Sequence, residues 1–227
     1  MTVIQHLEDL RRALIIASIG WLVATVAAYV VHNQVYLLLT QRAQVPRVFL
    51  LSPTAGVLLG LQIAFYLGLV LASPIIFWQL WWFVSPGLRA HEKRLILPLV
   101  GATTFFFLVG VAFALYALPL FMAILTALNP PGATYAPTGD SIISFVLVII
   151  LAFGVVFELP VVLYTLGMLR IISSRWLYRH RLYWLVGLGL IANLMTPGID
   201  PITPLLVFVP LYLFWEGTAL LLRLSGR

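Results

Sequence analysis

The chain has no cysteine, and only 9% of its 227 residues are charged. Without cysteine it can form neither a disulfide framework nor a thiolate metal site. Soluble domains carry about 25% charged residues, so this low content argues against an ordinary soluble protein. Because 63% of the residues are hydrophobic, the sequence indicates an integral membrane protein with little room for a soluble domain.

Catalytic signatures are absent as well. The sequence contains no H-E-x-x-H zinc motif, no G-x-S-x-G nucleophile motif and no Gly-Lys-Ser/Thr phosphate loop. No nucleophile and base are placed on facing apolar runs, which disfavours an intramembrane enzyme. We therefore expect a protein that is not an enzyme and that holds no metal or other cofactor.

Long apolar runs, in contrast, fill most of the chain. The candidate spans are residues 13–31, 57–84, a run within 95–128, 142–169, 182–195 and 202–222. Runs of this length favour helices over barrel strands. The fifth run covers only about 21 Å as a helix, against a hydrocarbon core of about 30 Å, so it could also be a buried or interfacial helix.

The basic residues indicate an orientation. With six spans and an inner N-terminus, 11 Lys and Arg residues lie inside and only Arg42 and Arg47 lie outside. Five spans would give a split of 9 against 4, so the positive-inside rule favours six spans with both termini inside. This pattern accounts for the net charge of +6 without a nucleic-acid partner.

The predicted fold is an all-α membrane protein with a single domain, residues 1–227. Residues 1–12 form a cytoplasmic amphipathic segment, and residues 32–56 and 129–141 form extracytoplasmic loops or caps. Prolines within the spans predict kinked helices that form a concave face. The last two spans are short, which implies local thinning of the bilayer or tilted packing against protein. The span prolines are Pro74, Pro98, Pro119, Pro160 and Pro210.

Glu158 lies alone within the fourth apolar run. A carboxylate at this depth costs about 2.5–3.5 kcal/mol on insertion scales, and such residues usually face a protein interior or a wet cavity. We therefore expect Glu158 to line a partly hydrated intramembrane site. The alternative is a proton-coupled small-solute transporter in which Glu158 carries the proton, which the absence of an internal repeat disfavours.

Acidic residues also occur among basic ones near the inner ends of the spans. Glu8 could pair locally with Arg11 and Arg12, or Glu8 or Asp9 could receive a cationic ligand. Glu92 could stabilise the start of the third span through the helix dipole, or it could be functional.

Two further acidic residues have structural interpretations. Glu216 lies near the inner end of the last span, where we expect its side chain to reach water. Asp200 lies in the outer turn, where it could cap the following helix.

Taken together, several short segments resemble the TatC family, the polytopic subunit of the twin-arginine protein translocase. The match runs along nearly the whole chain, and the order of its motifs is specific. These motifs are His6-Leu7-Glu8-Asp9-Leu10-Arg11, Ser52-Pro53-Thr54, Phe83-Val84-Ser85-Pro86-Gly87-Leu88 with Glu92-Lys93-Arg94, Phe153-Gly154 with Phe157-Glu158-Leu159-Pro160, Thr196-Pro197 with Asp200-Pro201, and Pro210-Leu211 with Glu216.

The resemblance implies a receptor in the bacterial inner membrane that binds twin-arginine signal peptides at its cytoplasmic face. Asp9 and Glu92 correspond to the family's arginine-recognition residues. Carboxylates suit guanidinium groups because they form bidentate hydrogen bonds. The supporting residues are Glu8, Arg11, Phe83 and Leu88.

The resemblance also implies partners. Such a receptor works with single-span TatA/TatB-type proteins, in an oligomeric complex within membrane lipid, and moves folded proteins by means of the proton-motive force. Thr196, Thr203 and Asp200 are the expected contacts for the partner helix. The family often has Ser-Gln in the outer turn, where this chain has Thr203-Pro204.

Overall fold

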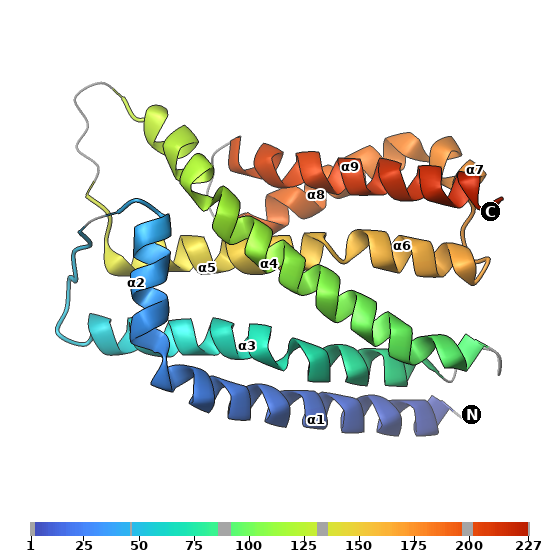
Figure 1. Cartoon of the computed structure of the whole chain (residues 1–227), viewed down its shortest axis with the longest axis horizontal. Coiled ribbons are helices and arrows are strands. Elements are labelled where there is room, and N and C mark those ends of the chain that lie inside the picture. The colour runs from blue at the N-terminus through green and yellow to red at the C-terminus, as the bar shows by residue number, and fades with distance from the viewer. Residues whose placement is uncertain (1–2, 46, 86–91, 131–135, 197–201, 227) are drawn as a thin grey trace. The chain divides into compact units, whose positions relative to one another are not determined.

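The computed structural model describes residues 3–45, 47–85, 92–130, 136–196 and 202–226. These residues form helices joined by turns (Figure 1). The α-helices are α1 (Val3–Val30), α2 (His32–Arg42), α3 (Ala55–Val84), α4 (Ile96–Ala127), α5 (Gly139–Val156), α6 (Leu159–Met168), α7 (Ser174–Arg179), α8 (Arg181–Met195) and α9 (Ile202–Leu224), and η2 (Glu92–Leu95) is a 3-10 helix. The described residues contain no β-strand, which confirms the predicted all-α class.

Five helical segments are long and apolar enough to cross a membrane. They are Ile4–Val30, Ala55–Val84, Ile96–Ala127, Gly139–Met168 and Ile202–Leu224, and they coincide with five of the expected spans. The remaining expected span is α8, which has 15 residues. At 1.5 Å per residue it covers about 22 Å, less than the hydrocarbon thickness of about 30 Å. The count of six spans therefore depends on α8 and stays a prediction.

The outer faces of these helices carry large apolar side chains. Leu22 and Val26 of α1 are 62% and 73% exposed, and Leu97 of α4 is 69% exposed. Exposed apolar surface costs about 25 cal/mol per Å² in water, whereas lipid tails are as apolar as leucine. The helices are therefore suited to a bilayer, as the sequence predicted.

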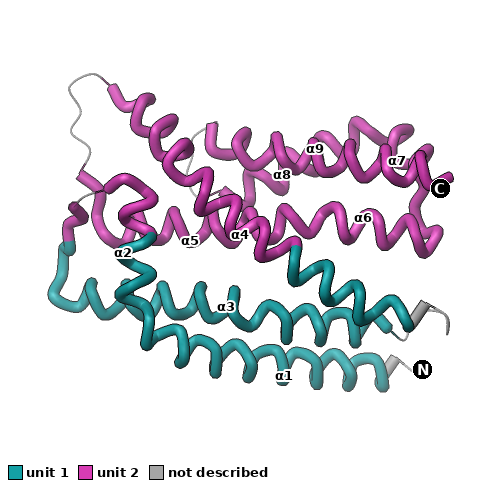
Figure 2. The backbone as a smooth tube through the Cα atoms, in the orientation of Figure 1, with its two compact units in different colours: residues 1–38, 50–105 teal, residues 39–49, 106–227 magenta. Residues whose placement is uncertain are grey.

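Two compact units divide the chain, residues 1–38 with 50–105 and residues 39–49 with 106–227 (Figure 2). In the first unit, α1 packs along α3. Gly68 permits the close approach, because a Cβ at this position would lie 2.6 Å from the Cα of Thr25. The indole nitrogen of Trp21 donates a hydrogen bond to the backbone oxygen of Phe65 at 3.0 Å. A single residue without a side chain thus fixes how closely the two helices pack.

In the second unit, α5 and α6 follow one another and α9 packs against both. Close packing again depends on a glycine. A Cβ at Gly110 in α4 would lie 2.4 Å from the backbone oxygen of Phe153 in α5. Trp215 and Val207 of α9 are fully buried. The buried core of this unit therefore includes α5 and the inward face of α9.

The predicted fourth span is broken between α5 and α6. Phe157 and Glu158 form a turn, and Pro160 lies in the first turn of α6. Proline is tolerated there because the first helical amides have no partner within the helix. The break places Glu158 at the N-cap of α6, although its side chain forms no capping hydrogen bond.

The two expected extracytoplasmic loops meet in the second unit. The Phe49 amide donates to the Pro137 oxygen at 3.1 Å, and the Gly139 amide donates to the Phe49 oxygen at 2.9 Å. Thr138 caps α5 by accepting a hydrogen bond from the Ser141 amide at 3.4 Å. Residues 129–130 and 136–141 thus belong to an ordered segment, while 131–135 lie outside the described residues.

Candidate functional sites

The acidic residues near the start of α1 have no partner within the described residues. Glu8 is exposed and Asp9 is half-buried, and neither forms an ion pair there. Local pairing of Glu8 with Arg11 or Arg12 is therefore not formed. Both carboxylates remain available for a cationic ligand.

A shallow depression of about 350 Å³ lies beside these acids. Glu8, Arg11 and Arg12 line it together with Ile15 and Ile16. Its lining carries both signs of charge, one carboxylate and two guanidinium groups, together with two apolar side chains.

Phe83 is brought to α1 by an aromatic contact between distant parts of the sequence. Its ring stacks on His6 with centroids 4.4 Å apart and an angle of 17° between the planes. The contact joins the first turns of α1 to the last turn of α3, so Phe83 belongs to the same unit as Asp9. Glu92 begins η2, but its side chain and all of Leu88 lie outside the described residues.

Glu158 is a shielded carboxylate in the second unit. Both of its oxygens are inaccessible to solvent, and neither makes a hydrogen bond of normal geometry with a described residue. The backbone of Phe107 in α4 faces it. An unpaired polar group in such a place costs about 1–3 kcal/mol or more, so Glu158 lowers the stability of the fold.

Aromatic rings pack around the break that holds Glu158. Phe157 lies 5.4 Å from Phe113 and 4.7 Å from Phe214, measured between ring centroids. Phe153 lies 5.4 Å from Phe113. These rings exclude water from the sides of the turn and supply no hydrogen-bond donor. The expected partial hydration of Glu158 stays a prediction.

The expected partner-helix residues are buried within the chain itself. Thr196 at the end of α8 is 7% exposed, and its hydroxyl donates to the Ala192 oxygen at 3.1 Å. Thr203 at the start of α9 is 1% exposed. Asp200, including its expected capping role, lies outside the described residues. Helices α8 and α9 form a hairpin, and Thr196 and Thr203 are therefore buried within the isolated chain.

A groove of about 370 Å³ runs between α8 and α9 on the outside of this hairpin. It is mostly apolar, with Asn193 as its polar member. Its lining residues are Leu185, Gly189, Asn193, Pro204, Leu205 and Phe208. The sequence reasoning did not find this groove, although Gly189 and Asn193 are four residues apart and thus share one face of a helix.

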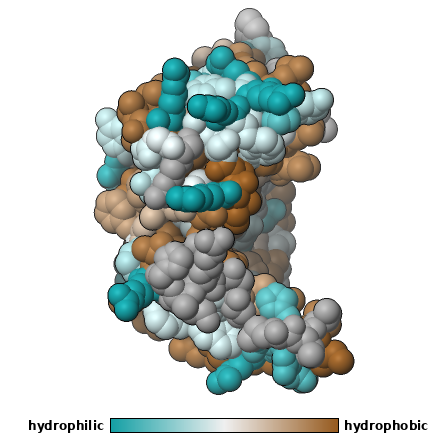
Figure 3. All heavy atoms as spheres, turned by 90° about the vertical axis from the view of Figure 1, so that its right-hand side faces the viewer, coloured by the Kyte–Doolittle hydropathy of each residue, from teal (hydrophilic) through white to brown (hydrophobic). Residues whose placement is uncertain are grey.

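A cluster of polar side chains closes the other end of the same hairpin. Arg181 donates to the Tyr212 hydroxyl, which in turn donates to Glu216 at 3.2 Å. The Arg181 guanidinium also lies 3.7 Å from the Glu216 carboxylate. The Glu216 side chain is 38% exposed, so it reaches water as expected, and it is paired as well. Figure 3 shows hydrophilic side chains gathered at the upper end, where α7 and the C-terminus lie.

Tyr178 of α7 borders this cluster. Burial, and then the negative charge of Glu216, raise the pKa of Tyr178 above its ordinary value of 10.0. Both effects disfavour the phenolate, the first because a charge is poorly solvated and the second because like charges repel. Tyr178 therefore remains protonated and can act as a hydrogen-bond donor over the whole physiological range.

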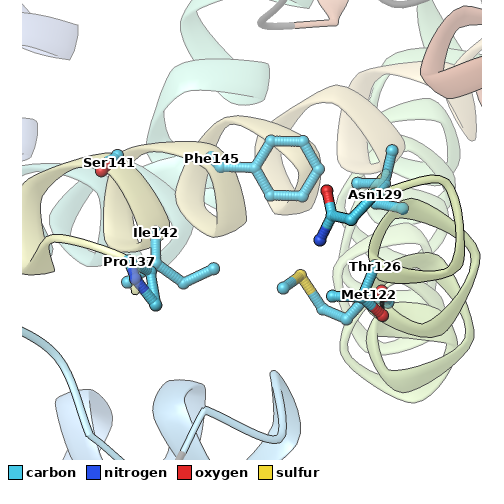
Figure 4. A pocket seen from close by; sticks show the side chains of 8 residues that line it. Met122, Thr126, Asn129, Pro137, Ser141, Ile142 and Phe145 are labelled. Carbon is cyan, nitrogen blue, oxygen red and sulfur yellow. Dashed lines mark hydrogen bonds between the residues drawn. The ribbon is translucent and has the colours of Figure 1, made fainter. Parts of the chain in front are cut away.

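A second pocket, of about 280 Å³, lies between the end of α4 and the start of α5. Figure 4 shows Met122 of α4 facing Ile142 and Phe145 of α5, with the Asn129 amide directed between them. The lining offers few polar groups and no titratable side chain. This pocket has no feature that assigns it a ligand.

Comparison with known proteins gives consistent matches along the chain. Residues 5–210 match the family described as Sec-independent protein translocase protein (TatC). The chain belongs to the TatC family. A TatC of Carboxydothermus hydrogenoformans is 37% identical, covering 95% of this chain and 90% of its own length. A TatC of Aquifex aeolicus is 34% identical, covering 100% and 97%.

Solved structures agree with the sequence comparison. A crystal structure titled as the twin-arginine translocase receptor TatC has a TM-score of 0.85 and 33% identity, covering 98% of this chain and 100% of that one. TatC proteins are multi-pass components of the inner membrane and are not enzymes, which confirms the predicted family, location and absence of catalysis. The five long apolar helices fit this assignment.

Proposed function

We propose that this chain is the receptor for twin-arginine signal peptides and that the arginines bind at Asp9 and Glu92. The observation that carries the proposal is the unpaired pair Glu8 and Asp9 beside a depression that Ile15 and Ile16 also line. Two adjacent guanidinium groups need two carboxylates, and Asp9 with Glu92 would supply them. Because Glu8 is exposed and next to Asp9, it can share this role.

Phe83 and Arg11 support the site in different ways. The stack of Phe83 on His6 holds the end of α3 against the start of α1, the helix that carries Asp9. Arg11 lines the depression beside Glu8 and would contact the bound peptide there. Leu88 would contact the apolar part of the signal peptide.

Direct binding measurements test this site. The purified chain in lipid nanodiscs should bind a labelled twin-arginine peptide at least about tenfold more weakly after Asp9→Ala or Glu92→Ala, because a charge-assisted hydrogen bond contributes about 1.5–3 kcal/mol. A twin-lysine peptide should bind the unaltered chain more weakly than the twin-arginine peptide, since lysine cannot form the bidentate contact.

Asp140→Ala provides the matched control. Asp140 is an exposed acid in the first turn of α5 and belongs to the second unit. Its removal changes the net charge of the chain by the same amount and should leave peptide affinity unchanged. Unaltered affinity in both Asp9→Ala and Glu92→Ala would contradict the assignment.

For the transport step, the proposal includes single-span TatA/TatB-type partners and export of folded proteins driven by the proton-motive force. The chain would cross the membrane six times with both termini inside, its kinked helices would form a concave face, and a partner helix would contact the turn around Thr196, Asp200 and Thr203. Because Thr196 and Thr203 are buried in the isolated chain, the partner would open the hairpin or contact its outer surface.

Glu158 would serve this translocase as an intramembrane polar site. Its oxygens lack partners within the described residues, so it is suited to accept a hydrogen bond from a signal or partner helix that enters the membrane. Photocrosslinkers at Phe157 and Val155 should capture such a helix only while a substrate is present. Equal capture without substrate would argue for a static structural role instead.

A further inference from the structure

We infer that the Arg181–Tyr212–Glu216 cluster, named here the clasp, sets the register of α8 against α9 and thereby positions the groove between them. Arg181 and Glu216 are positioning residues in this proposal. The inference concerns residues outside the signal-peptide site, and its partner readout rests on the proposed function.

The side chains that face each other along the hairpin follow a regular spacing. On α8 and α9 the residues recur every fourth position, so each set lies along one face of its helix. These are Arg181, Leu185, Gly189 and Asn193 on α8, and Pro204, Phe208, Tyr212 and Glu216 on α9. The clasp and the groove are therefore two ends of one continuous interface, about 18 Å long.

Apolar packing in the groove leaves the register weakly determined. A Cβ at Gly189 would meet the Phe208 ring only at 4.0 Å, and one at Gly187 would meet nothing within 4 Å. On α8, only Leu188 and Ala192 are buried. Since lipid tails are as apolar as these side chains, the bilayer provides no hydrophobic force that favours one register over a neighbouring one.

The clasp supplies contacts that favour one register of α8 against α9. The Arg181 guanidinium lies 3.7 Å from the Glu216 carboxylate and 5.6 Å from the centre of the Tyr212 ring. The Tyr212 hydroxyl bridges the two charged groups through hydrogen bonds. A slip of one helical turn moves α8 by about 5.4 Å and breaks all of these contacts at once. The Arg181 and Glu216 side chains are 52% and 38% exposed, so the clasp adds little to stability, but its directional contacts distinguish one register from the next.

A displaced α8 would change the groove at its far end. Leu185, Gly189 and Asn193 move with Arg181 because they belong to the same helix face, whereas Pro204, Leu205 and Phe208 stay with α9. A partner helix that binds this surface would then contact a different set of side chains. Disruption of the clasp should therefore weaken partner capture without affecting the signal-peptide site in the other unit.

Engineered disulfides measure the register directly, because the chain has no cysteine of its own. Gly189→Cys with Phe208→Cys reports the observed register, and Leu185→Cys or Asn193→Cys with Phe208→Cys reports a slip. Arg181→Ala should lower the yield of the first disulfide by about threefold or more, a size typical of one interhelical hydrogen bond in membranes. The yield of a slipped pair should rise.

Charge exchange separates positioning from simple loss of structure. The double variant Arg181→Glu with Glu216→Arg should restore the first disulfide, because the pair is re-formed with reversed sign. Arg179→Ala is the matched control, since Arg179 is an exposed arginine in the last turn of the neighbouring α7. Tyr212→Phe removes only the bridging hydroxyl and gives a second test if Arg181→Ala fails to fold.

The functional readouts are two. A photocrosslinker at Leu205, which lines the groove and is 56% exposed, should capture a co-expressed single-span partner less well in Arg181→Ala and normally in the charge-exchanged variant. Binding of a twin-arginine peptide should stay unchanged in both.

Two results would overturn the inference. The first is an unchanged disulfide pattern in both Arg181→Ala and Tyr212→Phe. The second is a shifted pattern with undiminished partner capture. If the unaltered chain captures no partner at Leu205, the partner step of the proposed function fails, and the disulfides alone then decide whether the clasp sets the register.

Discussion

Glu158 and Glu216 are both acidic residues in apolar segments of the second unit, Glu158 in the turn between α5 and α6 and Glu216 within α9, but their surroundings differ. Glu216 has an arginine at 3.7 Å and a tyrosine hydroxyl at 3.2 Å. Glu158 has two shielded oxygens without a hydrogen bond of normal geometry among the described residues. Aromatic rings surround the turn that carries it.

The difference separates a structural acid from a functional one. A carboxylate with a counter-ion and a donor stabilises its own neighbourhood, so its presence needs no further explanation. A shielded carboxylate without these partners destabilises the fold, so the fold alone does not account for it. On this basis Glu216 belongs to the architecture of the α8–α9 pair, and our proposal for Glu158 is a role in the transport step.

Replacement of Glu158 should cause the largest loss of export, and it should leave the stability of the chain equal or higher. We expect Glu158→Gln to reduce export of a folded twin-arginine substrate by about tenfold or more, because the amide cannot ionise or accept hydrogen bonds with both groups. The free energy of unfolding should stay equal or rise by about 1 kcal/mol, since the cost of the shielded carboxylate is removed. Export assays in vesicles and thermal unfolding of the purified chain provide the two measurements.

Glu158→Asp completes this experiment, because it keeps the charge and shortens the side chain by one methylene. Partial export by the aspartate variant would support a requirement for a carboxylate. If Glu158→Gln instead exports normally and unfolds more easily, the contrast with Glu216 is lost and both acids are structural.

Much of the fold could be predicted from the sequence because apolar run length and proline position act locally. Runs of adequate length gave five of the spans, and Pro160 marked the broken fourth span. The contact of His6 with Phe83 could not be predicted, since the two residues are 77 positions apart and no local pattern joins them. Arg181 and Tyr212 were likewise missed, although the spacing of Tyr212 and Glu216 places both on one helix face.

Loss of charge at Glu216 should have a smaller effect than loss at Glu158, and it should change the free energy of unfolding rather than export. Glu216→Gln keeps an oxygen that can accept from Tyr212 but removes the attraction to Arg181. Because both side chains are partly exposed, at 52% and 38%, we expect a loss of only about 0.5–1 kcal/mol in the free energy of unfolding.

Thermal unfolding in detergent, read by tryptophan fluorescence, measures the effect of Glu216→Gln. Export should fall only in proportion to the amount of folded protein. A loss of export greater than the loss of folded chain would place Glu216 beside Glu158 as a residue of the transport step.

The smallest expected effect is a dependence of stability on alkaline pH through Tyr178. Its pKa in the folded chain is raised above the ordinary 10.0 by burial and by the charge of Glu216. Between these two pKa values the unfolded chain releases the phenolic proton while the folded chain keeps it, so the folded state binds more protons and its stability falls as pH rises. The contribution is therefore fully present below pH 10.0 and is lost as pH rises through the folded pKa.

Glu216→Gln should lower the pKa of Tyr178 because it removes the repelling charge, whereas Asp140→Ala should not. A tyrosinate titration by ultraviolet difference spectroscopy, with Tyr178→Phe to assign the signal, would refute the proximity of Tyr178 to Glu216 if the titration were the same in all backgrounds.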